Sequence, residues 1–164
     1  MKDPTNALEL LKSQHEEVEA LIGKIERSEG GHKQELFIEM ADKLAAHATI
    51  EEKLFYPSVK ARQTEDALME AVEEHLQVKR LLADLLDLDC DDEEFDAKLS
   101  VMKEEIRHHA HDEEEDSLFP KVRRLFSADE LAALGAEMLA MFEEVLVDQP
   151  RNNVPLETDR AARI

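Results

Sequence analysis

The sequence predicts an all-α protein: an up-down-up-down four-helix bundle with a short additional C-terminal helix. Only four glycines and five prolines interrupt the chain of 164 residues, which favours long helices. Apolar residues recur at steps of three and four over several long stretches, which is the period of an amphipathic helix. The connections between these stretches are short, and short connections make consecutive helices antiparallel neighbours.

The first half of the chain predicts two helices. Asp3-Pro4 suit an N-cap and a first helical position, and Gly30-Gly31 end the helix that follows. The second helix ends before Pro57. The inward faces are Leu8, Leu11, His15, Val18, Leu21, Ile22 and Ile25 in the first helix, and Leu36, Phe37, Met40, Leu44, His47, Glu51, Leu54 and Phe55 in the second.

The second half predicts two more long helices and a shorter fifth one. Thr64 can cap the third helix, Leu88–Asp92 forms the next turn, and the fourth helix runs into Phe119-Pro120. Ser127 with Glu130 has the spacing of a capping box, which begins the fifth helix. The inward faces are Leu68, Val72, His75, Val78, Leu81, Leu82 and Leu85 in the third helix, and Phe95, Leu99, Met102, Ile106 and His109 in the fourth.

The chain divides into a folded part and a tail. Residues 1–147 form the expected bundle with its appended helix. Residues 148–164 are polar, contain two prolines and lack a helical period, so we expect a flexible tail there.

Composition limits the classes of partner. Acidic residues number 40 against 20 basic ones, giving a net charge of −20, which repels nucleic acid and anionic membranes but attracts cations. Cys90 is the only cysteine, which excludes an internal disulfide and a cysteine-based zinc or iron–sulfur site. The sequence shows no apolar leader at its N-terminus and no stretch long enough to span a bilayer, so we expect a cytoplasmic protein.

An internal repeat identifies four histidines with matching surroundings. Apolar residues follow both His15 and His75 at offsets +3, +6, +7 and +10, and they precede both His47 and His109 at −3, −7 and −10. Each half therefore has one helix with a histidine, followed by one with a histidine and a carboxylate. Glu51 lies four residues after His47, so both side chains share the apolar face of one helix.

Burial of these groups predicts a metal site. A carboxylate buried without a partner costs several kcal/mol, and coordination to a cation offsets that cost. Four histidines and two carboxylates in one core predict a two-metal site with bridging carboxylates. Mixed imidazole and carboxylate ligands favour iron, with manganese and zinc as the alternatives. A ferritin-like site needs Glu-x-x-His on two helices, and only Glu105 with His108 has that spacing.

The carboxylate of the fourth helix is open to more than one interpretation. The apolar residues upstream select His109, whereas the distance to the following proline selects Glu114, five residues later. A local π-type bulge would accommodate that spacing. Glu113 lies at the usual spacing of four and is nearly as good a candidate, and His111 with Glu115 is a third pair.

Four segments resemble the hemerythrin-like, or HHE cation-binding, family. They are "SQHEEVEAL", "HATIEEKLFYP", "EEHLQVKRLL" and "HHAHDEEEDSLFP", within about residues 5 to 125. The resemblance implies a four-helix bundle around a non-haem di-iron centre, bridged by two carboxylates and an oxo or hydroxo group. The implied ligands are His15, His47, Glu51, His75, His109 and Glu113 or Glu114.

One position departs from the oxygen-carrying members of that family, which have a second histidine one turn after the third-helix ligand. Lys79 occupies this position here, so one metal would lack a ligand that a solvent molecule or Tyr56 could replace. We expect a di-iron protein that binds dioxygen or peroxide, or senses oxygen, iron or redox state. The alternatives are an enzyme that decomposes peroxide or oxidises ferrous iron, and a metal-free helical interaction protein.

Overall fold

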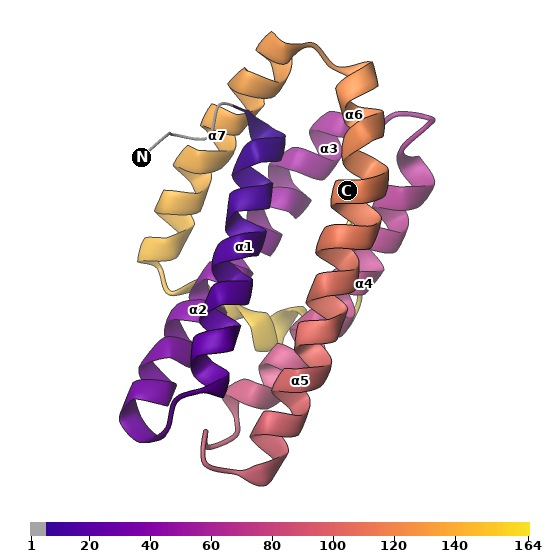
Figure 1. Ribbon diagram of the computed structural model, residues 1–164. Helices are drawn as coiled ribbons and strands as arrows, with labels where there is room; N and C mark the ends of the chain where they lie inside the picture. Colours follow the sequence, from indigo (N-terminus) through magenta and orange to yellow (C-terminus); the bar gives the residue numbers. More distant parts are fainter. Residues whose placement is uncertain (1–5) are drawn as a thin grey trace.

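A computed structural model describes residues 6–164 and contains helices but no strands in that range. Four long helical rods lie side by side, and two of them are continuous across several segments (Figure 1). The first two rods are α1 (Ala7–Glu26) and then α2 (Gly30–Ile50), η1 (Glu51–Phe55) and α3 (Tyr56–Val59). The other two are α4 (Glu65–Leu86) and then α5 (Glu93–Arg107), η2 (His108–Leu118) and α6 (Phe119–Leu125). The chain ends with α7 (Ala128–Val147) and the 3-10 helix η3 (Pro150–Glu157), and the predicted all-α bundle with an added helix is confirmed.

The boundary between the first two rods differs slightly from the prediction. Asn6 caps α1, because its side chain accepts a hydrogen bond from the Glu9 backbone N–H at 3.0 Å. The predicted cap at Asp3-Pro4 lies outside the described residues. α1 ends before the glycine pair, and α2 begins at Gly30, whose φ of 61° lies in the left-handed region that glycine adopts most easily.

The predicted caps of the later helices are of two kinds. Ser127 and Glu130 form the expected capping box, since each accepts a hydrogen bond from the other's backbone N–H at 3.1 Å. Thr64 is the N-cap residue of α4, but its side chain makes no capping hydrogen bond to that helix and stabilises the preceding loop. Its hydroxyl donates to the Val59 carbonyl at 2.8 Å and accepts from the Ala61 N–H at 2.9 Å.

Two apolar clusters fill the bundle, one toward each end. In the first, Phe37 and Phe95 meet edge to face with their centroids 5.0 Å apart. In the second, Phe55 and Phe119 do the same at 5.9 Å. Along each rod the histidine of the repeat lies between residues of the two clusters, so a polar layer is enclosed between apolar ends.

The C-terminal residues differ from the flexible tail that the sequence predicts. η3 packs on α2 and α4, and its Val154 is only 2% exposed. Arg151 anchors the segment to Asp42 of α2 through its backbone N–H at 3.1 Å and its guanidinium at 2.6 Å. A 3-10 helix has three residues per turn, so a search for the α-helical period does not detect it.

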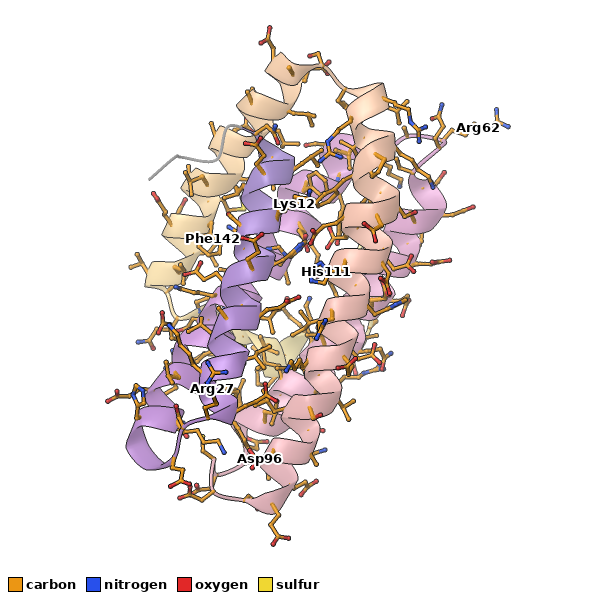
Figure 2. All side chains as sticks on the ribbon, viewed as in Figure 1. Lys12, Arg27, Arg62, Asp96, His111 and Phe142 are labelled. Carbon is orange, nitrogen blue, oxygen red and sulfur yellow. The ribbon has the colours of Figure 1, made fainter. Side chains whose placement is uncertain are left out.

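The outside of the bundle is strongly charged, and side chains such as Arg62 project away from it (Figure 2). Between residues 6 and 164, none of the helices combines the length and apolar character needed to cross a bilayer. α7 packs on α1 and α2 and comes very close to the start of α1 at Gly135.

Candidate metal centre

The four histidines of the repeat meet inside the bundle, each from a different rod. All four are buried, with exposures of 3% for His15 and 6% for His47, His75 and His109. The potential ligand atoms form two groups, and within each group all of the atoms lie within 4.8 Å of one another. Cluster A consists of His15, His47, Glu51 and Glu114, and cluster B consists of Glu51, His75 and His109.

The two carboxylates connect the clusters. Glu51 Oε1 lies 3.2 Å from His47 Nε2, while its Oε2 lies 2.9 Å from His75 Nε2. Glu114 Oε1 lies 2.7 Å from His109 Nε2 and 3.6 Å from His15 Nε2. Each carboxylate therefore reaches one histidine of each cluster, which is the placement that a bridging ligand requires.

Several of these atoms face the centre without a hydrogen bond from the described residues. They are Nε2 of His15, Oε1 of Glu51 and both carboxylate oxygens of Glu114. Such buried atoms are costly unless something else satisfies them. In cluster B, Nε2 of His75 and Nε2 of His109 lie 3.1 Å apart. A cation between such atoms would satisfy them, and imidazoles and carboxylates are donors that metal ions accept.

The other ring nitrogen of each histidine has a fixed partner. Nδ1 of His47 donates to the Gln14 amide oxygen at 2.7 Å, and Nδ1 of His109 donates to Glu74 at 2.9 Å. A neutral ring that donates through Nδ1 keeps the Nε2 lone pair free for a metal. The hydrogen bond also fixes the orientation of the ring.

The remaining two histidines are supported in the same way by the residues that follow the carboxylates. Nδ1 of His75 donates to Glu52 at 2.7 Å, and Nδ1 of His15 donates to Glu115 at 2.9 Å. The four supporting residues obey the repeat: two directly precede His15 and His75, and two directly follow Glu51 and Glu114. We did not identify these roles from the sequence, although the repeat itself carries the signal.

Without a metal, the cluster takes up protons. Burial disfavours the charged form of His15, but the neighbouring carboxylates of Glu114 and Glu115 outweigh it and raise its pKa to about 9. Burial likewise opposes charge on His109, yet the Glu114 carboxylate holds the pKa of this ring well above its usual value. Burial tends to raise the pKa of Glu51, and the neighbouring rings of His47 and His75 lower it far below the ordinary value. The carboxylates thus favour positive charge at the centre, whether from protons or from a metal.

The π-helical segment η2 explains how Glu114 reaches the centre. η2 contains the whole second motif, and Glu114 is 1% exposed within it. Glu113 points outward, with its side chain 36% exposed and near His108. The structure therefore brings Glu114, at spacing five, to His109, through the π-type distortion that the repeat required. η1 begins at Glu51 and places a matching distortion in the first half.

The third candidate pair does not reach the interior. His111 is 37% exposed and its Nε2 contacts Glu19 of α1 at 2.5 Å. Its Nδ1 lies 3.0 Å from Glu115, whose carboxylate is already bonded to His15. His111 and Glu115 thus lie outside both clusters, on the face of η2 toward α1.

Tyr56 makes the two clusters chemically different. Its hydroxyl lies 3.2 Å from His75 Nε2, 3.4 Å from His109 Nε2 and 3.3 Å from Glu51 Oε2. The equivalent residue of the second half is Phe119, whose ring stacks near His15 with a centroid distance of 6.4 Å. Cluster B therefore has an oxygen atom where cluster A has only an apolar ring.

Lys79, which stands in place of a ligand histidine, contacts a supporting residue instead of the centre. Its ammonium group donates to Glu52 Oε1 at 2.8 Å and to Glu157 of η3 at 3.3 Å. Burial raises the pKa of Glu52, but His75 and then Lys79 bring it below the ordinary value. Lys79 thus links the C-terminal segment to the residue that orients His75.

The fold and this ligand arrangement are those of a hemerythrin-like protein, and comparison with known proteins agrees. The model of the Hemerythrin HHE cation binding domain matches residues 6–122, so the chain belongs to this family. The crystal structure of a hemerythrin HHE cation binding domain-containing protein from Mycobacterium kansasii is similar, with a TM-score of 0.76 and 27% identity. The similarity covers 96% of this chain and 94% of that one.

A curated relative is similar over part of its length only. It is a protein of Nostoc sp. named DNA nickase, 26% identical over 140 residues. The match includes 85% of this chain but only 40% of the relative. This chain spans less than half of the relative's length, and the name belongs to the whole relative. For this chain, the absence of nucleic-acid binding stays a prediction from net charge.

Proposed function

We propose that this chain is a non-haem di-iron protein that binds dioxygen or peroxide at the centre formed by clusters A and B. The observation that carries the proposal is the pair of carboxylates, each placed between a histidine of cluster A and a histidine of cluster B. His15 and His47 would hold one iron, His75 and His109 the other, and Glu51 and Glu114 would bridge them. Bound iron would supply a Lewis acid and a source of electrons.

The surrounding residues prepare the site for a small ligand. The hydrogen bonds at Nδ1 orient the rings, and the apolar clusters at both ends keep bulk water away. Each cluster offers two histidines and shares the two carboxylates, and cluster B has the Tyr56 hydroxyl in addition. Because Lys79 stands in place of a ligand histidine, positions on the metals remain to be filled by solvent or by a small molecule.

Metal analysis tests the proposal. Protein loaded with ferrous iron under exclusion of air and then desalted should retain about two irons per chain, and His47→Ala should retain fewer. His108→Ala is the matched control, because the His108 side chain is 52% exposed and lies outside both clusters. Wild-type protein that retains no iron, manganese or zinc would refute a metal function and support the helical interaction protein instead.

Peroxide decomposition is the second candidate function, and the position of Tyr56 favours it. The Tyr56 hydroxyl lies beside His75 and His109 and would supply a proton there, while bound iron would supply the redox chemistry. The iron-loaded protein should then release oxygen from peroxide faster than the same amount of free iron, and His47→Ala should abolish the difference. A rate equal to that of free iron would leave only ligand binding.

A further inference from the structure

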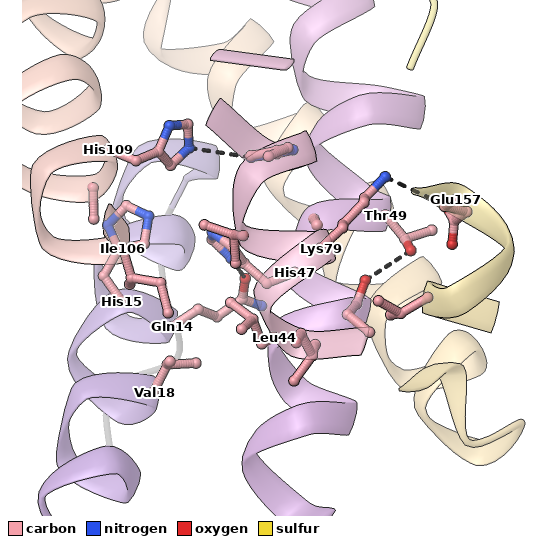
Figure 3. A pocket seen from close by; sticks show the side chains of 17 residues that line it. Gln14, His15, Val18, Leu44, His47, Thr49, Lys79, Ile106, His109 and Glu157 are labelled. Atoms are coloured by element: carbon pink, nitrogen blue, oxygen red, sulfur yellow. Dashed lines mark hydrogen bonds and ion pairs between the residues drawn. The ribbon is translucent and has the colours of Figure 1, made fainter. Parts of the chain in front are cut away.

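An apolar pocket lies beside the centre and contacts all four histidines (Figure 3). Its volume is about 40 Å³, and aliphatic side chains from four helices line it. These side chains are Val18, Leu44, Val78, Leu82 and Ile106. One water-sized molecule needs roughly 10–15 Å³ measured in this way, so the pocket can hold a molecule of two heavy atoms.

The C-terminal segment forms the outer wall of this pocket. Val154 and Glu157 of η3 line it, and Val154 is buried among the residues of the first apolar cluster. The Glu157 side chain is 44% exposed and reaches Lys79 at the pocket. These two residues therefore stand between the pocket and the solvent.

The two ends of the bundle and the side between α1 and η2 are closed by other contacts. The two apolar clusters fill the ends of the bundle. Between α1 and η2, contacts of Glu115 with His15 and of Glu19 with His111 occupy the surface. η3, by contrast, is a short segment outside the four rods, held by a few polar contacts and two buried residues, Pro150 and Val154. Such a segment opens at a lower free-energy cost than the rods that it covers.

We propose that Val154 and Glu157 form the gate through which small molecules reach the metal centre, and that the gate limits them to about the size of dioxygen or peroxide. The inference that dioxygen or peroxide then binds at the centre rests on the function proposed above. The access route itself does not require bound metal. The sequence predicts only a flexible polar tail for residues 148–164, with contact to a partner as one possible use.

The protein contains a reporter for this route. Tyr56 is the only tyrosine, and the chain has no tryptophan, so the intrinsic fluorescence comes mainly from one ring. That ring lies 5.5 Å from the His75 ring, centroid to centroid, and His75 lines the pocket. Collisional quenching of Tyr56 in the metal-free protein therefore measures how readily a molecule passes the gate.

The test compares dissolved dioxygen, which fits the pocket, with acrylamide, which is larger. In wild-type protein dioxygen should quench Tyr56 and acrylamide should have little effect. Val154→Ala should raise the acrylamide quenching constant several-fold, whereas Val154→Phe should lower the dioxygen constant by a similar factor. Leu156→Ala is the control on the same segment, because Leu156 is 82% exposed, and it should change neither constant.

Opposite effects of Val154→Ala and Val154→Phe on the quenching constants distinguish a gate from a residue that only stabilises the fold. Unchanged quenching in both Val154 variants, or equal changes in Leu156→Ala, would overturn the proposal. If Val154→Phe does not fold, Arg151→Ala provides a second variant: loss of the Asp42 contact should raise acrylamide quenching, and no change would count against the gate. Iron content is measured separately, so a wild-type protein without iron would refute the proposed function while the quenching result still decides the access route.

Discussion

Substitution of Glu114 by glutamine should reduce metal binding while preserving the size and shape of the side chain. Glu114 is 1% exposed and its carboxylate lies between His15 and His109, so an amide would remove a charge that both clusters use. Loss even of a residue that only supports a metal ligand typically weakens binding by about 10- to 100-fold, and a bridging ligand should cost at least the upper value.

This factor translates into thermal stability. A 100-fold weaker affinity lowers the stabilisation by excess metal by about 2.7 kcal/mol. For a chain of this size, about 1 kcal/mol corresponds to roughly 2–4 °C, so the melting temperature of the loaded variant should lie about 5–11 °C below that of loaded wild type. The metal-free variant also loses the ion pairs of Glu114 with His15 and His109, so the comparison uses the rise in melting temperature on loading with metal, which should be smaller in the variant by this amount.

Glu113→Gln is the matched control for this substitution. Glu113 is the adjacent residue with the same chemistry, but its side chain is 36% exposed and directed toward His108. Calorimetry and metal analysis on both variants, with and without iron, measure the difference. If Glu113→Gln loses the metal-dependent stabilisation and Glu114→Gln keeps it, the assignment from the π-helical register is incorrect.

Three further predictions concern separate features. Tyr56→Phe should leave the fold intact but lower iron affinity and abolish any absorption band from a phenolate–iron contact; identical spectra and affinity would exclude Tyr56 as a ligand. Gly135→Ala should destabilise the protein by a few kcal/mol in denaturant titrations, because its Cβ would lie 2.6 Å from the Ala7 backbone nitrogen, whereas Gly31→Ala meets nothing within 4 Å and should be tolerated. Metal-free protein should lose stability as pH rises. The folded pKa of His15 is about 9 against an ordinary 6.5, so its contribution, on the order of 3 kcal/mol, is complete below pH 6.5 and disappears as pH rises through 9. Denaturant midpoints that rise over this pH range would contradict it.

The helical rods and most of the centre follow from sequence because they depend on periodicity. Apolar steps of three and four fix which face of each helix is buried, and His15 and His75 inherit their orientation from that face. The structure places both of them, with His47 and Glu51, where the repeat predicts. Whether they bind iron stays a prediction for the metal analysis.

The uncertain parts are those where the helical period changes. From the sequence, Glu113 and Glu114 were nearly equal candidates for the carboxylate ligand. A π-type turn shifts the helical register by one residue, and no characteristic amino-acid composition marks such a turn. Val154 was missed for a similar reason, since its burial depends on contacts of η3 with α2 and α4, far away in the sequence. Lys79 could be recognised as a departure, but its pairing with Glu52 and Glu157 became visible only in three dimensions.

The repeat has a consequence for assembly. Cluster A takes Glu114 from the second half of the chain, and cluster B takes Glu51 from the first, so neither half contains a complete set of ligands. A fragment that ends in the loop before α4 could coordinate metal fully only by pairing with the other half or with a second copy of itself. A metal ion bound at either cluster would therefore also join the two halves of the chain.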